Sequence, residues 1–320
     1  MRWSYSVHTA MRRCQRQLVF AQVLASPLSR DPERREAHVL KQLQHLSAWH
    51  GNLVHKVLAN DFLVTLMSGQ AIDPGALTRA TLNLAQRQFP FSAAKLYREP
   101  GQTKTAAGDD YCALFEHEYE REIPSDVFAE VQVKATRCFE NLASQQSFLA
   151  SLYAGSGHLA ELRLNFRFNG TALMAIPDLV FLHADGQPTV IDWKVADSET
   201  SDYAYQLLVY ALAVARSGRW PQVRPEAIEL YEANLLKNQI RRYPVTHERL
   251  EEAEDFVYRS LVELETLVDD GKYEHLDMNE FEVAERPLSC YHCNFASLCI
   301  RQLEAGGHSK EAAVVQGRLL

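Results

Sequence analysis

Two short apolar runs, joined by an Asp-Gly turn, carry two carboxylates and a lysine. The first run, Ile176 to Val180, contains Asp178, and the second, Thr189 to Val195, contains Asp192 and Lys194. Because side chains alternate along a β-strand, Asp192 and Lys194 project from one face of the predicted hairpin, and Asp178 reaches that face from the partner strand. Two carboxylates can hold a hard divalent cation. The pattern predicts metal-dependent phosphodiester cleavage; an ordinary cross-strand salt bridge is the alternative.

A second set of reactive side chains has the spacing C-x2-C-x5-C near the end of the sequence: Cys290, Cys293 and Cys299. In a cytosolic chain a structural disulfide is disfavoured, and neighbouring thiolates suit a soft metal or an iron-sulfur cluster. Cys14, on the apolar stripe of the predicted N-terminal helix, is the best candidate for a fourth ligand. Zinc is equally satisfied by four thiolates. Cys112 and Cys138 lack a nearby ligand and are predicted to be buried free thiols.

The composition limits the classes of protein to consider. The 320 residues are 47% hydrophobic and 23% charged, which is ordinary for a globular chain with a substantial core. The net charge of -8 excludes a global basic field, so any nucleic acid must be held by a local basic lining. We find neither an apolar run of membrane-spanning length nor a signal-peptide core, and expect a cytoplasmic protein.

The N-terminal segment, Ser4 to Leu24, has the apolar spacing of a helix capped by a serine. Three arginines form a small basic rim on it, and they are candidates for contact with DNA: Arg12, Arg13 and Arg16. A solvated charged face is the usual alternative for such a group. A polar helix over 33–49 is expected next, and Gly51 is expected to begin a further helix that carries His55.

The middle of the chain, from Asp61 to Tyr153, has helical patterns, interrupted by a polar run over 100–110 that predicts a mobile loop. After the Gly-Ser-Gly segment at 155–157 the pattern alternates, and 162–168 is predicted to be the first strand of the sheet that carries the site. Glu161, at the start of this strand, is either a further carboxylate of the site or an exposed edge charge.

A helix over 203–215 follows a polar loop at 197–202, and it places Gln206 and Tyr210 on one face. Two further strands are predicted over 227–234 and 239–245, followed by a long amphipathic helix over 248–268 that packs on the sheet. The residues after Arg301 are rich in glycine, alanine and charge, and a loose tail is expected there.

Taken together, these motifs resemble a RecB-like nuclease of the PD-(D/E)XK superfamily with an iron-sulfur cluster, as in CRISPR-associated exonucleases and the AddB subunit of recombination complexes. The motifs stand in the family's order along the chain: Gly51-x3-His55, Pro177-Asp178, Ile191-Asp192-Trp193-Lys194, Gln206-x3-Tyr210, and Cys14 with Cys290, Cys293 and Cys299. One departure is the residue after the first cysteine, where the family often has proline and this chain has Gln15.

The resemblance implies a role for each motif. His55, Asp178, Asp192 and the backbone carbonyl of Trp193 would ligate Mg2+ or Mn2+, and Lys194 would position the nucleophilic water or stabilise the charge of the phosphorane. A histidine among oxygen ligands shifts the preference toward manganese. Gln206 and Tyr210 would stand beside the catalytic site, and the match of Glu161 to the family is looser. Cys14, Cys290, Cys293 and Cys299 would hold a 4Fe-4S cluster.

The resemblance also implies the fold: an α/β, restriction-endonuclease-like core with a mixed central sheet flanked by helices, a large helical insertion and a cluster that joins the chain ends. A single nuclease domain over 1–303 is expected, followed by a flexible tail over 304–320. Within the domain we expect a cluster region, an insertion and a catalytic core, at 1–25 with 286–303, at 59–156 and at 157–270.

The function implied is a metal-dependent deoxyribonuclease, with an exonuclease acting on single-stranded DNA ends in repair, recombination or phage defence as the leading hypothesis. An endonuclease subunit directed by a partner helicase or defence complex is the second. A catalytically silent DNA-binding adaptor is the third, and the intact Asp178, Asp192 and Lys194 set argues against it. The sequence has no Walker motif and hence no visible ATP motor of its own.

Overall fold

The computed structural model describes residues 2–197, 203–268, 272 and 276–317. The chain divides into two compact units. The terminal unit comprises Met1–Leu46, Phe91–Arg121 and Tyr258–Leu320, and the sheet unit comprises Ser47–Pro90 and Glu122–Val257. Residues 59–156, predicted as one helical insertion, are therefore divided between the two units. Most of the predicted loop at 197–202 lies outside the described residues.

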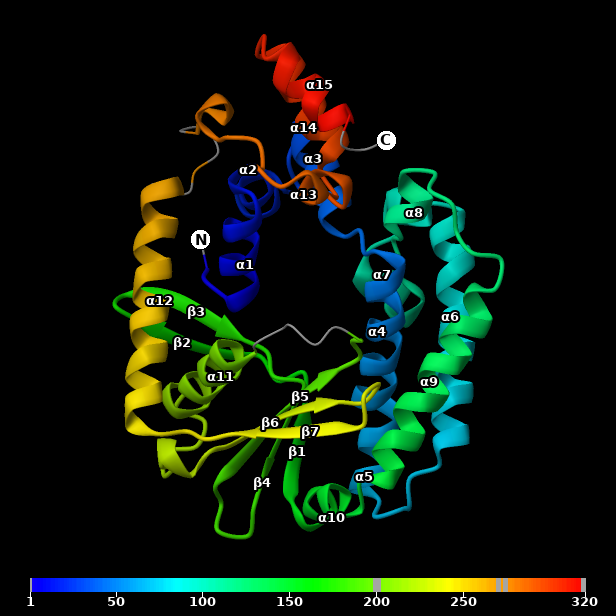
Figure 1. The fold of residues 1–320 in the computed structure, drawn as a ribbon, viewed down its shortest axis with the longest axis vertical. Helices are drawn as coiled ribbons and strands as arrows, with labels where there is room; N and C mark the ends of the chain where they lie inside the picture. The colour runs from blue at the N-terminus through cyan, green and yellow to red at the C-terminus, as the bar shows by residue number, and fades with distance from the viewer. Residues whose placement is uncertain (1, 198–202, 269–271, 273–275, 318–320) are drawn as a thin grey trace. The chain divides into compact units, whose positions relative to one another are not determined.

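A five-stranded mixed sheet, in the order β1-β4-β5-β6-β7, forms the centre of the sheet unit (Figure 1). Its strands are β1 (Ser156–Ala160), β4 (Leu179–Leu182), β5 (Pro188–Lys194), β6 (Glu229–Asn234) and β7 (Gln239–Tyr243). Neighbouring strands are antiparallel except β5 and β6, which run parallel. This confirms the mixed α/β class, the predicted hairpin of β4 and β5, and the two further predicted strands, β6 and β7.

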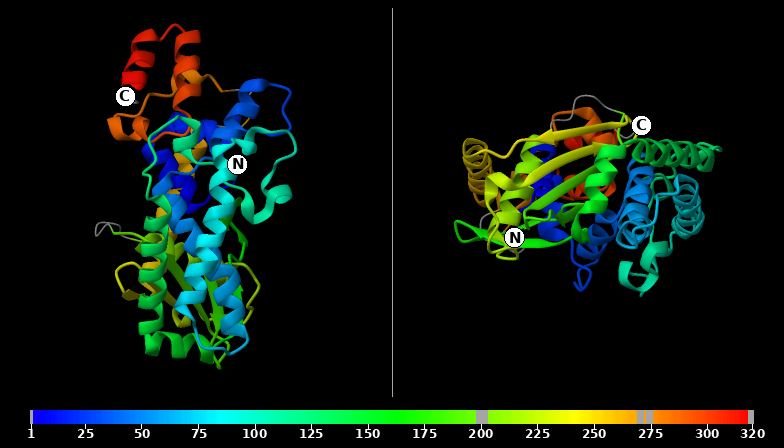
Figure 2. Two further views of the ribbon diagram at one scale, coloured as in Figure 1. Left: turned by 90° about the vertical axis from the view of Figure 1, so that its right-hand side faces the viewer. Right: turned by 90° about the horizontal axis from the view of Figure 1, so that it is seen from below.

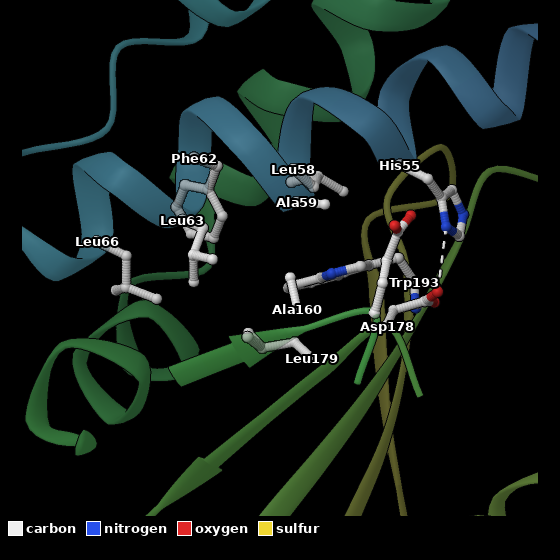
Figure 3. Close-up of a pocket in the computed structure, with 11 residues that line it drawn as sticks. His55, Leu58, Ala59, Phe62, Leu63, Leu66, Ala160, Asp178, Leu179 and Trp193 are labelled. Atoms are coloured by element: carbon white, nitrogen blue, oxygen red, sulfur yellow. Dashed lines mark hydrogen bonds and ion pairs between the residues drawn. The ribbon is translucent and has the colours of Figure 1, made fainter. Parts of the chain in front are cut away.

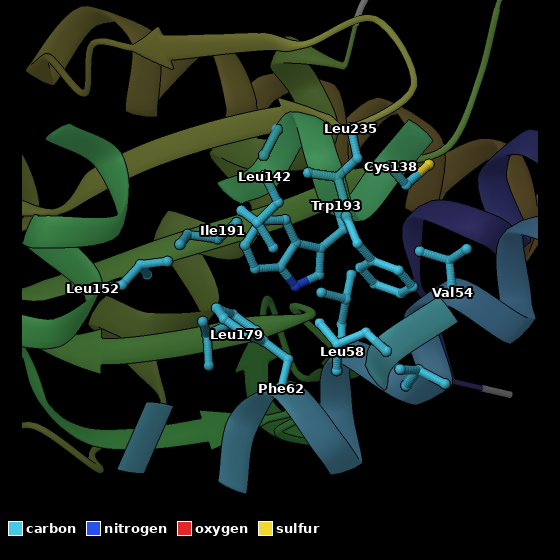
Figure 4. Packing of buried hydrophobic residues seen from close by; sticks show 14 of the residues in the cluster. Val54, Leu58, Phe62, Cys138, Leu142, Leu152, Leu179, Ile191, Trp193 and Leu235 are labelled. Atoms are coloured by element: carbon cyan, nitrogen blue, oxygen red, sulfur yellow. The ribbon is translucent and has the colours of Figure 1, made fainter. Parts of the chain in front are cut away.

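The β4–β5 hairpin has the predicted alternation. Val180 is paired with Val190. Continuing this register by two residues on each strand places Asp178 opposite Asp192, on the same face of the sheet. Gly186 closes the turn with φ of 76°, a conformation that favours glycine. The opposite face of β5 carries Trp193, which lies at the centre of a buried cluster (Figure 4).

The prediction that 162–168 forms the first strand of the central sheet was wrong. Residues 164–168 form β2 (Leu164–Phe168), which pairs with β3 (Thr171–Ala175) as a separate two-stranded sheet, while β1 supplies the edge strand of the central sheet. Glu161 has φ of 47°, so the chain turns out of the central sheet between β1 and β2. Asn169 and Gly170 form the turn between β2 and β3, and both residues have positive φ.

Helices cover both faces of the central sheet. Their bounds are α4 (Leu46–Val57), the π-helical turn η2 (Leu58–Phe62), α5 (Leu63–Met67), α6 (Pro74–Ala93), α9 (Val127–Ser144), α10 (Gln146–Ala154), α11 (Ala204–Arg216) and η5 (Pro225–Ala227). Side chains of α4, α9 and α10 pack on the Trp193 face, and α11 packs against β5 and β6. Figure 2 shows α4, α6 and α9 running alongside one another.

Gly51 does not begin a helix, which corrects the expectation. It lies inside α4, and a Cβ placed on it would lie 3.8 Å from the Cβ of Val195, an ordinary contact distance. The helix continues because Leu53, Val54 and Val57 are buried against the core, which outweighs the low helical propensity of one glycine. The predicted 33–49 helix is likewise two helices, α3 (Pro32–Lys41) and α4.

The terminal unit is helical. Its elements are α1 (Tyr5–Arg13), α2 (Gln15–Val19), the π-helical turn η1 (Phe20–Leu24), α3, η3 (Leu96–Arg98), α7 (Lys104–Ala107), η4 (Gly108–Asp110), α8 (Phe115–Glu118), η7 (Met278–Glu280), α13 (Pro287–Tyr291), α14 (Ala296–Ala305) and α15 (Ser309–Gly317). Helix α12 (His247–Val268), which was predicted, runs through the boundary between the units in the sequence.

Two expectations for the terminal unit are corrected. The side chain of Ser4 caps α1 as predicted, but Cys14 is extended, with φ of -167°, and interrupts the helix there. The expected loose tail contains α15, because Ala312 and Val315 are buried in the same cluster as Leu303. The 100–110 run also contains short helical turns, α7 and η4. Among the described helices, none has the length and apolarity needed to cross a membrane.

Candidate active site

Asp178 is fixed between neighbouring strands just before β4. Its Oδ2 accepts a hydrogen bond of 2.7 Å from the backbone amide of Trp193, and its own carbonyl accepts one of 3.0 Å from the amide of Glu161. The carboxylate is therefore oriented by the backbone of both β1 and β5. Its remaining oxygen, Oδ1, faces His55.

Asp192 and Lys194 form a buried ion pair on β5. Asp192 is only 2% exposed, and its Oδ2 meets the ammonium of Lys194. No described residue donates a hydrogen bond of ordinary geometry to this oxygen. Burial, with the charge of Asp178 adding to it, raises the pKa of Asp192, although Lys194 and His55 oppose the shift. A carboxylate in this state favours a further positive charge beside it.

Helix α11 holds the lysine from the other side. Lys194 Nζ donates to Gln206 Oε1 at 3.2 Å, and Gln206 Nε2 donates to the hydroxyl of Tyr210 at 2.8 Å. Burial and the charges of Asp192 and Asp178 hold the pKa of Tyr210 well above its usual value, so the phenol keeps its proton. The predicted Gln206-Tyr210 face is thus directed at Lys194.

His55 reaches the carboxylates from α4. Its Nδ1 lies 3.4 Å from Asp178 Oδ1 (Figure 3). Burial disfavours the imidazolium, but the hydrogen bond and charge of Asp178, with the charge of Asp192, outweigh burial and raise the pKa of His55. His55, Asp178 and Glu161 line one pocket with apolar side chains of η2 and α5, and its interior has about 10 Å³ of room for the centre of a water molecule, enough for about one water.

The chemistry of this donor set fits a divalent cation. Two carboxylates, one of them buried in an ion pair with Lys194, converge with an imidazole, and all three groups are metal ligands in proteins. The side chains are paired with each other: no group of three or more His, Cys, Asp or Glu in the described part of the chain has metal-holding geometry. Binding a cation would therefore replace the His55–Asp178 contact and relieve the burial cost at Asp192.

The structure adds Tyr203, the residue directly before α11, to the groups around Lys194. The ring of Tyr203 lies 4.0 Å from Lys194 Nζ, a distance typical of a cation–π contact. Its position three residues before Gln206 was the available signal. Glu232 on β6, in register with Asp192, was also missed; it is buried and accepts a 2.7 Å hydrogen bond from Tyr243.

The four predicted cysteine ligands lie in the terminal unit, where, as at the carboxylates, no group of three or more His, Cys, Asp or Glu side chains among the described residues has metal-holding geometry. All four belong to one apolar cluster: Cys14, Cys290, Cys293 and Cys299. Burial raises the pKa of Cys293, and the neighbouring thiols raise it further. Cys112 and Cys138 are separate from this set, as predicted; burial raises the pKa of each thiol to about 12.

The three candidate DNA-binding arginines have different environments. Arg16 is 2% exposed, and its guanidinium donates to the carbonyl oxygens of Met278, at 2.7 Å, and Phe281, so it cannot meet DNA. This corrects the prediction, because buried carbonyls rather than solvent satisfy the charge. Arg12 pairs with Glu263 at 2.9 Å. Arg13 is exposed.

A search of curated proteins found no match. Among solved structures, the crystal structure of SSO0001 has 13% identity and a TM-score of 0.27, over 58% of this chain and 78% of that one. A crystal structure from Eubacterium rectale described as a "Putative exonuclease" has 14% identity and a TM-score of 0.34, over 81% and 95%.

The family comparison covers almost the whole chain. Residues 2–300 match the family described as the PD-(D/E)XK nuclease superfamily. The mixed five-stranded sheet is consistent with this fold. The chain therefore belongs to the PD-(D/E)XK nuclease superfamily.

Proposed function

We propose that this protein is a metal-dependent nuclease that hydrolyses DNA phosphodiester bonds, as an exonuclease on single-stranded ends. The observation that carries the proposal is the convergence of Asp178, Asp192 and Lys194 on one face of the sheet, with His55 3.4 Å from Asp178. An ordinary salt bridge does not account for a second carboxylate and an imidazole at the same point. Membership of the nuclease superfamily supports this reading.

In this proposal the metal is Mg2+ or Mn2+, held by Asp178, Asp192, His55 and the Trp193 carbonyl. When bound, it would lower the pKa of a water and neutralise charge on the phosphate. Lys194 provides a positive charge for the developing oxyanion, and Gln206 with the Tyr203 ring keeps its ammonium in place. Tyr210 orients Gln206. Glu161 lines the same pocket, and we propose it as an additional carboxylate of the site.

We also propose that the four clustered cysteines hold a 4Fe-4S cluster, with zinc as the rival occupant. Their common apolar environment supports ligation, because buried thiolates repel one another unless a bound soft metal or cluster neutralises their charge. Iron and sulfide analysis of anaerobically purified protein distinguishes the two, since zinc gives neither iron nor visible absorbance.

The alternatives differ in what they cut. A partner-directed endonuclease, working with a helicase or defence-complex subunit, would use the same site but cleave closed circular DNA. A silent adaptor would bind DNA and cleave nothing. We therefore expect end-labelled linear single strands to be degraded with Mn2+ or Mg2+, while a closed single-stranded circle survives.

The decisive variant is Asp192→Asn, which keeps the side-chain shape and removes the carboxylate charge. We expect it to abolish cleavage and leave DNA binding nearly unchanged; His55→Ala should act less completely, since water can replace one neutral ligand. Asp185→Asn is the matched control, because Asp185 lies in the exposed turn of the same hairpin. Cleavage by pure Asp192→Asn at the wild-type rate would contradict the assigned site.

A further inference from the structure

An exposed tyrosine near the cysteines is surrounded by cationic and aromatic side chains. The guanidinium of Arg121 lies over the ring of Tyr291, 5.2 Å from its centroid, and the ring of His292 meets it edge-on at 4.7 Å. Tyr291 is 37% exposed, and Leu288, one turn earlier on α13, is 71% exposed. The Tyr291 ring is therefore accessible for stacking while the guanidinium of Arg121 packs on it.

Two imidazoles and a second arginine border this ring. His45 packs edge-on against His292, with centroids 5.2 Å apart, and its Nε2 lies 2.9 Å from the His292 carbonyl oxygen. The exposed Arg13 lies close enough that its charge acts on both imidazoles. The carboxylate of Glu116, beside His45, is already engaged by that imidazole and by the amide of Leu46. Arg121 and the exposed Arg13 supply the positive charge of this surface in a chain of net charge -8.

We propose that Tyr291, Arg121, Arg13 and His292 bind a single strand of DNA, with an unpaired base stacked on Tyr291 and flanking phosphates beside the two guanidiniums. The inference rests on the proposed function for the choice of DNA as ligand. Aromatic stacking combined with cationic contact to phosphates is the general mode of single-strand binding. A duplex does not present a free base face, so the surface selects single strands.

The stacking component is tested by fluorescence anisotropy with a labelled thymidine oligonucleotide, in the Asp192→Asn background to prevent cleavage. Tyr291→Ala should weaken binding about 5- to 100-fold, the range expected for one stacked base. Tyr291→Phe keeps the ring and should retain wild-type affinity. Tyr258→Ala is the matched control, since Tyr258 is a 50% exposed tyrosine on α12 of the same unit.

The phosphate component is tested by salt dependence. Arg13→Gln and Arg121→Gln should each reduce the slope of log affinity against log salt by about 0.7, the value for one phosphate contact to a single strand. Arg30→Gln is the control, because Arg30 is an exposed arginine of the same unit that is not part of this surface. If one variant fails to fold, the others still decide the question.

Equal affinity of Tyr291→Ala and Tyr258→Ala would overturn the inference, and so would an equal loss of duplex binding, which would indicate charge without stacking. A wild-type protein that binds the strand but never cleaves it would contradict the proposed function and leave this surface intact. Cleavage with no dependence of affinity on Tyr291 would contradict this surface alone.

Discussion

Asp178 and Lys194 in the sheet unit are charged groups oriented by hydrogen bonds from neighbouring elements, whereas the four cysteines of the terminal unit lie in an apolar cluster where burial raises the pKa of Cys14, Cys293 and Cys299. The Trp193 amide fixes Asp178 at 2.7 Å and Gln206 fixes Lys194 at 3.2 Å. The cysteine ligands come from the two ends of the sequence, and Arg16 ties the N-terminal helices to the segment before α13 through carbonyl oxygens.

This difference has a physical consequence. The catalytic groups are held by strand pairing and side-chain hydrogen bonds that persist without a metal, so loss of the metal should remove activity before it removes structure. Buried thiols have raised pKa values, as Cys14 and Cys299 show, and only ligation makes their deprotonation favourable. The terminal unit should therefore depend on its cluster for stability.

The largest effect is expected from Cys14→Ser. It should lose iron and much of the soluble yield, because metal ligation is coupled to folding of the segments it joins. Cys112→Ser and Cys138→Ser should keep both, since these thiols lie outside the four-cysteine set. Iron and sulfide content of each purified variant is the measurement. Full iron content in Cys14→Ser would break the proposed difference between the units.

Lys194→Ala should lower turnover about 100- to 1,000-fold, the loss typical for removing one group that stabilises developing charge. Metal affinity, measured by calorimetry, should change little, because the ammonium does not ligate the ion. Lys237→Ala, in the β6–β7 turn, serves as the control. An equal loss of metal binding and of turnover would show that the lysine acts by positioning the carboxylates.

Two glycines of the sheet unit predict opposite stability changes. A Cβ at Gly155 would lie 2.2 Å from Cδ2 of the buried Phe181, so Gly155→Ala should lower the free energy of unfolding by about 1–3 kcal/mol. Gly51→Ala, inside α4 with room against Val195, should raise it by about 0.5–1 kcal/mol. Urea unfolding measures both. Destabilisation by Gly51→Ala would contradict the position of Gly51 inside α4 and would favour the predicted helix start at this residue.

The last prediction concerns the contribution of the ionised Glu118 side chain to the stability of the terminal unit. Burial opposes its ionisation, but Arg98 and the Tyr97 hydroxyl, bonded to it, lower its pKa. A lowered native pKa adds stability that is present above the unfolded value of about 4.3 and is lost as pH falls through the native value. Glu118→Gln should cost about 1 kcal/mol at pH 7.

The pH profile of urea unfolding tests this assignment. The difference between wild type and Glu118→Gln should narrow as pH falls below about 4.3. Glu120→Gln is the control, because the Glu120 side chain is exposed and its ion pair with Lys95 is long, at 4.0 Å. A difference that stays constant down to the acid transition would mean that the Arg98 ion pair does not stabilise the unit.

The local pattern of the sequence was sufficient for the β4–β5 hairpin and for the helix that carries Gln206 and Tyr210. A period of two fixes which side chains share a strand face, and four residues span about one helical turn. The common face of Asp192 and Lys194 therefore follows from spacing alone. The superfamily assignment rests on the same motifs and is confirmed over residues 2–300.

Which strand pairs with which is not a local property. The alternation of 164–168 was read correctly, yet β2 pairs with β3 outside the central sheet, because the turn at Glu161 redirects the chain. The break at Cys14 was equally hidden, since an apolar stripe continues across it. The periodicity of apolar residues indicates which face of a helix or strand is buried, but it does not indicate which other helix or strand packs or pairs with it.

The sequence by itself determined the chemistry available: the carboxylates Asp178 and Asp192, the lysine between sheet and helix, and the cysteine spacing. Only the tertiary structure decided how each charge is used. The guanidinium of Arg16 donates to a buried carbonyl oxygen, while Arg13 stays exposed. The ring of Tyr203 packs against the ammonium of Lys194. The reason is that a charge acts according to its burial and partners, which come from segments distant in the sequence.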